Sequence, residues 1–270
     1  MRLFRSWRSM MLVAMLPAML LAMLLVLAPP ARAADGFVQL DAGRGDARIP
    51  VYAMENAQAG ATLILLPGGD AGTGKISNGE PGSGNFLVRA RQLFVDQGFN
   101  VLVMFRASDL RVLDFPERIS SEHVTEIAHV IDYARTTYGK PVWLVGTSRG
   151  TVSATAAAIA LGPDRIAGMV LTSSVTNRKA GAIGSQDLDK ITVPTLVVHH
   201  KLDACPICVP SQAEALIGRL KNAPQRKFIL VEDGSAPQGD PCEAWHWHGY
   251  PHAEAQTVKL ITDWIRQPSS

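Results

Sequence analysis

The stretch Pro141 to Gly150, PVWLVGTSRG, decides the fold predicted for this 270-residue chain. It opens with a short apolar run, and an alanine-rich segment follows it to about Leu161. This order predicts a buried strand that leads directly into a helix. Gly146, Ser148 and Gly150 occupy the turn, where tight packing requires small residues beside the serine. The pattern Gly-x-Ser-x-Gly predicts a strand-turn-helix unit that lifts the serine hydroxyl above a sheet.

Short β-rich runs alternate with longer helical segments on both sides of this turn. The sequence predicts strands at Phe37 to Leu40, Arg48 to Met54, Ala61 to Leu66, Asn100 to Phe105, Pro141 to Val145, Ile166 to Thr172, Thr195 to His200 and Lys227 to Val231. It predicts helices at Asn85 to Gln97, Ser120 to Thr137 with Ser121 as a cap, after Gly150 to about Leu161, Pro210 to Leu220 and Glu254 to Ile265. Such alternation is typical of an α/β fold, with a mostly parallel central sheet flanked by helices.

The chain begins with the features of an export signal. Arg2, Arg5 and Arg8 precede an apolar run from Met10 to Leu27, and the small residues of Ala31-Arg32-Ala33 follow. We therefore predict a signal peptide at residues 1–33, cleavage near Ala33, and a single domain at residues 34–270 that is periplasmic or secreted. The alternative is an uncleaved membrane anchor, because the apolar run approaches the length that spans a bilayer.

The composition restricts the classes of partner. The chain is 47% hydrophobic and 19% charged, which fits an ordinary globular domain. Loss of residues 1–33 removes four arginines and no acidic residue, which turns the formal net charge of +2 into −2. Without a basic cluster we predict no nucleic-acid partner, and no later segment is long and apolar enough to span a membrane. The oligomeric state stays open.

A serine nucleophile needs a histidine base and a carboxylate that orients this base. Asp203 lies just past the predicted strand TLVVHH, and the carboxyl ends of parallel strands are where catalytic groups gather. The competing carboxylates, which resemble ordinary loop residues, are Asp187, Asp189, Asp233 and Asp240. We predict that Asp203 is the catalytic acid.

Three histidines lie in the loop before the last predicted helix. His248 is followed by Gly249, which allows a tight loop that presents the imidazole ring. His246 lies between two tryptophans, and His252 is close to the start of the helix. We predict that His248 is the general base, with His252 as the second candidate.

Two backbone amides should stabilise the oxyanion that forms during attack on a carbonyl. The amide of Arg149 directly follows the candidate nucleophile, and the loop after the third predicted strand supplies Gly69. Glycine lets a backbone approach a ligand closely, although a plain glycine turn would have the same sequence. We predict Gly69 and Arg149 as the two donors.

Several motifs in order resemble the α/β-hydrolase superfamily, over essentially all of Phe37 to Ile265. The matching motifs are LPGGD (Leu66 to Asp70), NFLVR (Asn85 to Arg89), PVWLVGTSRGT (Pro141 to Thr151), LTSSVT (Leu171 to Thr176), VVHHxxDxC (Val197 to Cys205) and CxxxxxHGY (Cys242 to Tyr250). The chain looks most similar to poorly characterised exported bacterial members. The resemblance implies an α/β-hydrolase fold, with Ser148, Asp203 and His248 as its triad.

The resemblance also implies an activity and its alternatives. It favours a serine hydrolase that acts on a small-molecule ester or related acyl substrate, as carboxylic ester hydrolases do, with no metal and no cofactor. Only residues 174–195 are available for a lid, so we expect none of large size and an open site. One alternative is a metal-dependent hydrolase built on the His, Asp and Cys cluster of the two loops. The other is a non-catalytic binding protein on a hydrolase scaffold.

Three cysteines permit one disulfide and one free thiol in an oxidising compartment. Cys205 lies two residues after Asp203, and Cys242 lies six residues before His248, so a bond between them would brace the two loops. The rival pairing of Cys205 with Cys208 would make a C-x-x-C motif of redox or metal type. We predict the pair Cys205 and Cys242, with Cys208 unpaired.

Overall fold

The computed structural model describes residues 35–177 and 181–270. Asp35 to Ser270 form one compact unit. The predicted signal peptide at residues 1–33 lies outside the described residues. In the described part of the chain, no helix combines the length and apolar character that crossing a bilayer requires.

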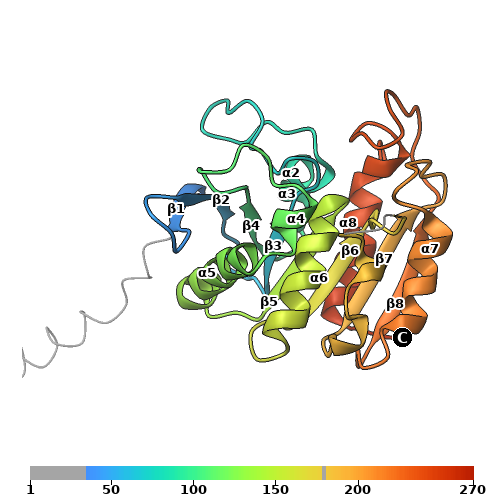
Figure 1. Cartoon of the computed structure of the whole chain (residues 1–270). Coiled ribbons are helices and arrows are strands. Elements are labelled where there is room, and N and C mark those ends of the chain that lie inside the picture. Colours follow the sequence, from blue (N-terminus) through green and yellow to red (C-terminus); the bar gives the residue numbers. More distant parts are fainter. Residues whose placement is uncertain (1–34, 178–180) are drawn as a thin grey trace, which may run out of the picture. The chain divides into compact units, whose positions relative to one another are not determined.

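A single mixed sheet is the framework of this unit (Figure 1). In the described residues it has eight strands, in the order β1-β2-β4-β3-β5-β6-β7-β8. Their bounds are β1 Gly36–Asp41, β2 Arg48–Met54, β3 Thr62–Leu66, β4 Asn100–Met104, β5 Val142–Thr147, β6 Gly168–Thr172, β7 Thr195–His200 and β8 Arg226–Val231. Strand β2 pairs antiparallel with β1 and β4, and all other neighbours are parallel. The predicted fold class is confirmed.

Helices cover both faces of this sheet. Their bounds are α2 Phe86–Arg89, α3 Arg91–Asp96, α4 Phe115–Arg118, α5 Ser121–Tyr138, α6 Arg149–Leu161, α7 Pro210–Ala215 and α8 Glu254–Arg266. Helices α5 and α6 lie in front of the strands in Figure 1, whereas α8 lies behind them. The central strands are therefore buried on both sides, which explains their continuous apolar sequences.

Alternate residues of one strand serve the two apolar cores. In β3, Ile64 and Leu66 belong to the core beneath α5 and α6, and Leu63 and Leu65 belong to the core beneath α2, α3 and α8. Side chains of successive strand residues point to opposite faces, so a sheet between two helical layers needs apolar residues at every position. The strands whose carboxyl ends carry the candidate site are therefore anchored in both cores.

Some predicted bounds were wrong in detail. The helix predicted at Asn85 to Gln97 is divided into α2 and α3 at Ala90, with Asn85 as the cap of α2. Ser120, rather than Ser121, caps α5, because its hydroxyl accepts the amide of His123 at 3.2 Å. Helix α4 was not predicted, since a single turn has no apolar period that could reveal it.

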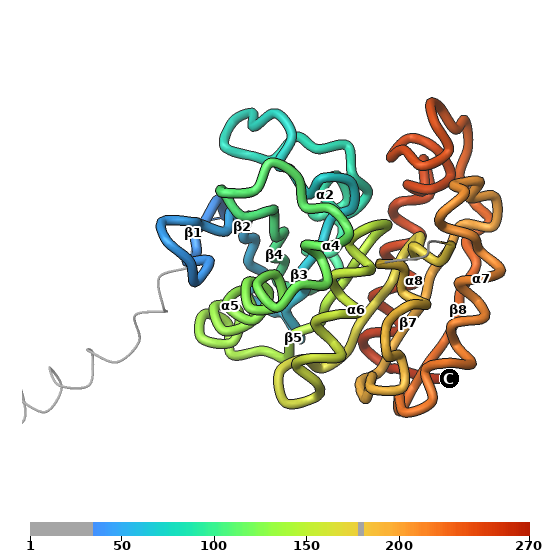
Figure 2. The backbone as a smooth tube through the Cα atoms, viewed as in Figure 1, coloured from blue at the N-terminus to red at the C-terminus, as the bar shows by residue number. Residues whose placement is uncertain are grey.

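The connection between β6 and β7 is short, as expected. Its described residues hold two single 3-10 turns, Ile183–Ser185 and Leu188–Lys190. The carboxyl ends of the strands are therefore covered mainly by two other loops, residues 67–85 after β3 and residues 232–253 after β8. Figure 2 shows both loops extending from the same end of the sheet.

Candidate active site

Ser148 stands at the turn between β5 and α6. Its backbone has φ 51° and ψ −126°, a left-handed conformation that L-residues with a side chain rarely adopt. The Ser148 amide donates to the carbonyl of Thr172 at 3.0 Å, and its carbonyl accepts the amide of Thr151 at 2.9 Å. Backbone strain of this kind persists only where the surroundings enforce it, and it occurs often at functional sites.

The two glycines of the motif make this turn possible. A Cβ on Gly146 would lie 2.5 Å from the carbonyl oxygen of Gly150, and one on Gly150 would lie 1.9 Å from that of Leu66. Neither contact is sterically allowed, so strand and helix approach each other closely only with glycine at both positions. The local geometry therefore has the form that the sequence pattern predicts.

Asp203 and His248 meet at the adjacent strand ends. Asp203 follows β7, His248 lies in the turn Trp247–Gly249, and the Nδ1–H of His248 donates to Oδ2 of Asp203 at 2.9 Å. The other carboxylate oxygen of Asp203 accepts the amide of Cys205 at 3.0 Å. Both side chains are buried. In the neutral form of the ring this bond leaves Nε2 as the acceptor, and Nε2 has no hydrogen-bond partner in the described residues.

The rival residues lie in other settings. Asp187 forms an exposed ion pair with Lys190 at 2.8 Å, and Asp240 accepts the amide of Cys242. His252 is exposed, and His246 is half-buried. Of the three histidines in this loop, only His248 makes an ion pair with a carboxylate in the described residues.

The loop after β3 passes directly over Ser148. A Cβ on Gly68 would lie 2.7 Å from Cβ of Ser148 and 3.3 Å from its Oγ. The carbonyl of Gly68 accepts the amide of Ala71 at 3.1 Å, so the Gly69 N–H of the same peptide points the opposite way. Arg149 is the first residue of α6, where helix amides have no partner within the helix. Gly69 and Arg149 thus bring two amides to the neighbourhood of the serine.

The comparisons with known proteins bear on the fold. No family model matches the sequence, and no curated protein matches it. Solved structures with 15% identity and TM-scores of 0.59 and 0.62 include the esterase Est1E from Butyrivibrio proteoclasticus and a dienelactone hydrolase from Anabaena variabilis; each match covers 86% of this chain and 98% or 97% of the other. A serine hydrolase without a lid from Xanthomonas campestris has 17% identity and a TM-score of 0.60, with 88% and 97% covered. The chain has the α/β-hydrolase fold. The resemblance stated from the sequence is confirmed for the fold.

The α/β-hydrolase fold of this chain carries a covalent brace. A disulfide joins Cys205 to Cys242, whose Cα atoms are 4.6 Å apart, and Cys208 is a buried free cysteine. The predicted pairing is confirmed. The bond ties the loop of Asp203 to the loop of His248, which are 37 residues apart at their cysteines.

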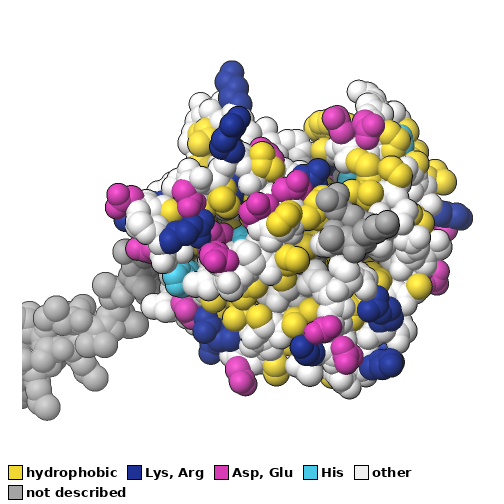
Figure 3. Space-filling model, in the orientation of Figure 1, with side chains coloured by type: hydrophobic (Ala, Val, Ile, Leu, Met, Phe, Trp, Pro, Cys, Tyr) yellow, Lys and Arg dark blue, Asp and Glu magenta, His cyan; other side chains and the backbone are white. Residues whose placement is uncertain are grey.

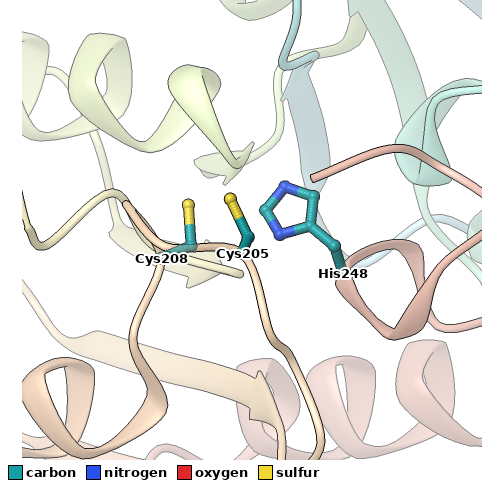
Figure 4. A group of neighbouring side chains, drawn as sticks. All are labelled: Cys205, Cys208 and His248. Atoms are coloured by element: carbon teal, nitrogen blue, oxygen red, sulfur yellow. The ribbon is translucent and has the colours of Figure 1, made fainter. Parts of the chain in front are cut away.

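Cys208 lies within the site, which the sequence did not indicate. Burial and the charge of Asp203 raise the pKa of the Cys208 thiol, while the nearby hydroxyl of Ser148 lowers it. Figure 4 shows the sulfur atoms of Cys205 and Cys208 on the side toward which the His248 ring points. The thiol is therefore a neutral neighbour of the candidate nucleophile at physiological pH.

The same three side chains are the candidate metal ligands among the described residues. One potential ligand atom of each of Cys205, Cys208 and His248 lies within 4.8 Å of the others. The sulfur of Cys205 forms the disulfide with Cys242, and Nδ1 of His248 is hydrogen-bonded to Asp203. Two free ligand atoms remain, Sγ of Cys208 and Nε2 of His248, whereas zinc sites in proteins use at least three protein ligands.

A cleft of about 350 Å³ opens above these residues. Gly68, Ser148 and His248 line its floor, and Phe86 and the exposed Trp245 line its side. In Figure 3 the surface rises at the top into two parts with a hollow between them, where Figure 1 places the loops after β3 and β8. The cleft has room for a small ligand with an apolar part.

Arg89 links the two walls of the cleft. It donates to the carbonyls of Gly84 and Gly249, pairs with Glu254 at 2.8 Å, and stacks over the Trp245 ring at 4.6 Å. Burial lowers its pKa, and the contact with Glu254 opposes this effect. The motif NFLVR did not reveal this function, because two of the partners, Gly249 and Glu254, lie 160 and 165 residues away in the sequence.

His199 is a second buried histidine beside Asp203. Its Nδ1 lies 3.8 Å from Oδ2 of Asp203, and neither ring nitrogen makes a well-formed hydrogen bond in the described residues. Burial lowers the pKa of His199 to about 4, and the charge of Asp203 only partly offsets this. His199 is therefore neutral at pH 7.

Proposed function

We propose that the protein is a serine hydrolase that cleaves an ester or a related acyl substrate through an acyl-enzyme. The observation that carries this proposal is Ser148 in a strained turn on the floor of a cleft, beside a buried His248 whose Nδ1–H is bonded to Asp203. The three groups are those that an activated serine requires. The printed descriptions of the structural neighbours as esterases and serine hydrolases support the same reaction class.

The chemistry follows from the roles of these atoms. Oγ of Ser148 attacks the carbonyl carbon while Nε2 of His248 takes its proton, and Asp203 stabilises the imidazolium that forms. The amides of Gly69 and Arg149 donate to the oxyanion. The imidazolium then returns its proton to the leaving alcohol, and water attacks the acyl-enzyme by the same steps. The free Nε2 is the acceptor that this step needs, and the bond from serine to histidine often forms only with substrate present.

The cleft favours a modest acyl substrate. It is open, and the connection in which related folds carry a lid holds only short turns in its described residues. Phe86 and Trp245 offer apolar contact area on one wall. We propose a soluble small-molecule ester as the substrate class.

Hydrolysis of a short-chain p-nitrophenyl ester tests the proposal, together with labelling by a fluorophosphonate probe. We expect turnover and labelling of the wild type, and loss of both in Ser148→Ala. Ser121→Ala is the matched control, because Ser121 is exposed on α5 and does not line the cleft. Absence of labelling of the folded wild type would refute the serine mechanism.

We also propose that the protein is exported after cleavage near Ala33. The supporting observations are the sequence of residues 1–33 and the disulfide between Cys205 and Cys242, a bond that persists in oxidising compartments. Mass spectrometry of the protein from the periplasm or medium should give an N-terminus at Ala34. Recovery of the intact N-terminus in the membrane fraction would instead indicate an anchor.

A further inference from the structure

Arg118 is a fully buried arginine, 1% exposed, at the end of α4. Burial lowers the pKa of its guanidinium to about 9, and the charge of Arg149 acts in the same direction. It forms no ion pair within the described residues. Its hydrogen-bond partners are three backbone carbonyls and one hydroxyl. A buried cation without a carboxylate is costly, so its position calls for a physical reason.

Two of these carbonyls belong to the loop that passes over Ser148. One terminal nitrogen of Arg118 donates to the carbonyls of Pro67 and Gly69, each at 3.2 Å. The carbonyl between them, that of Gly68, accepts the amide of Ala71. All three carbonyls of residues 67–69 are therefore bound within the protein. Because N–H and C=O point in opposite directions in a trans peptide, these bonds set the directions of the amides of the loop.

A chain of buried groups holds the guanidinium in turn. Its other terminal nitrogen donates to Oγ of Ser153 at 3.0 Å, and this hydroxyl donates to Nε2 of His123 at 3.0 Å. Nδ1 of His123 donates to the carboxylate of Glu126 at 2.8 Å, which also pairs with Arg44. Ser153, His123 and Glu126 are each at most 3% exposed.

The directions of these bonds are consistent with one another. The carboxylate of Glu126 can only accept, so Nδ1 of His123 carries the proton of that bond. In the neutral ring Nε2 is then the acceptor, and the Ser153 hydroxyl donates to it while accepting from arginine. Burial lowers the pKa of His123 and so favours this neutral form, although its bond to Glu126 opposes the shift. The group from Arg118 to Glu126 therefore has a single arrangement of protons.

We propose that Arg118 is a positioning residue that sets the oxyanion-binding amides of the loop 67–70, and that Ser153, His123 and Glu126 orient its guanidinium. The inference rests on the proposed serine mechanism. Arg118 does not touch the substrate. It binds the carbonyls of the two peptides before and after the one that carries the Gly69 N–H, and so holds that peptide in place from both sides. Its charge also polarises the two peptides that it binds. Preorganised donors lower the barrier because they do not reorient as charge develops.

Replacement of the guanidinium tests this role. In Arg118→Met we expect kcat for the p-nitrophenyl ester to fall about 10- to 100-fold while KM changes less than about threefold, since only transition-state binding depends on oriented donors. A trifluoromethyl ketone, which forms a tetrahedral oxyanion with the serine, should lose affinity by a similar factor. Arg118→Lys keeps a charge but cannot reproduce the bonding of the guanidinium, and should recover only part of kcat.

Two further variants complete the design. Arg165→Met removes an arginine that bonds to the carbonyl of Ala128 and to Asp132 away from the cleft, and should leave kcat unchanged. Ser153→Ala keeps Arg118 but breaks the chain that holds it, and should lower kcat about three- to tenfold. If Arg118→Met shows no cooperative melting transition, the kcat of Ser153→Ala tests the role of Arg118 in its place.

The outcomes separate the two proposals. An active, labelled wild type with an unchanged kcat in folded Arg118→Met overturns the role of Arg118 alone. If Arg118→Met does not fold, an unchanged kcat in Ser153→Ala overturns it, and beside a reduced kcat in folded Arg118→Met it overturns the orienting role of Ser153. Equal changes in kcat and KM with no change in ketone affinity overturn the role of Arg118 as well, because they indicate a general structural effect. A folded wild type that neither turns over nor labels overturns the serine mechanism and this inference with it.

Discussion

The two sides of the candidate site are held by different means. On the acid and base side, a disulfide between Cys205 and Cys242 ties together the loops that carry Asp203 and His248. On the oxyanion side, the buried Arg118 holds a short loop through hydrogen bonds to its carbonyls. One side is braced covalently and the other electrostatically.

The difference follows from the lengths of the segments. The loop after β8, residues 232–253, has no regular element apart from a single turn at Trp247–Gly249. Fixing this loop against the Asp203 loop therefore costs much conformational entropy. A crosslink lowers this cost by restricting the unfolded chain. The part of the β3 loop over Ser148 spans only residues 67–70, and a single side chain with several donors can hold it.

The largest effect is expected from the acid and base side. Asp203→Asn keeps the shape of the side chain but presents an amide to Nδ1 of His248, which favours the wrong tautomer of the ring. We expect kcat to fall by about 10⁴-fold, as it does for the same change in a serine protease triad. Steady-state kinetics with the ester measure it, and melting should show a folded protein. A fall smaller than in Arg118→Met would reverse the ranking of the two sides.

Loss of the disulfide should be the next largest effect. The paired change Cys205→Ser and Cys242→Ser removes a crosslink between residues 37 positions apart. The free energy of unfolding should fall by about 3 to 4 kcal/mol, because the unfolded chain is no longer restricted. Urea unfolding measures the loss, and a reductant should destabilise the wild type but not the variant. Equal stability of the two proteins would show that hydrogen bonds alone hold the acid and base side.

Acid should lower the free energy of unfolding through His199, which lies beside Asp203 on the acid and base side. Burial lowers its pKa from 6.5 to about 4, so the unfolded chain binds more protons between these values and stability falls as the pH drops from 6.5 to 4. The loss should reach about 3 kcal/mol and then level off. His199→Leu loses no well-formed hydrogen bond and should flatten this part of the profile of unfolding free energy against pH. A variant with an unchanged slope would assign the acid sensitivity to other groups.

The smallest effect is expected from an ion pair at the rim of the oxyanion side. Asp70 and Arg106 lie 2.7 Å apart, but the Asp70 side chain is 58% exposed. Exposed pairs contribute little, so Asp70→Asn should change the free energy of unfolding by less than about 1 kcal/mol. A larger loss of unfolding free energy, measured by heat or urea, would mean that the pair of Asp70 and Arg106 also holds the loop in place, as Arg118 does.

The sequence placed two candidate site residues near strand ends. Ser148 directly follows β5 and Asp203 comes three positions after the end of β7, so their places at the carboxyl edge of the sheet follow from the apolar runs of the strands. The disulfide pairing was also predicted, from the positions of Cys205 and Cys242 beside the candidate acid and base. Arg118 was not, because it belongs to a single helical turn with no periodic signal.

Patterns of sequence thus determined the order of strands and helices, the strand-turn-helix at Ser148 and the candidate acid and base. These depend on local steric limits and on the burial of apolar residues, which act over a few neighbouring positions. Folding alone brought Arg118 beneath Gly69, Arg89 between the walls of the cleft, and Cys208 beside Ser148. The bonds of Arg118 to Gly69 and of Arg89 to Gly249 join residues 49 and 160 positions apart, and a buried polar group is identified only by the partners that satisfy it in three dimensions.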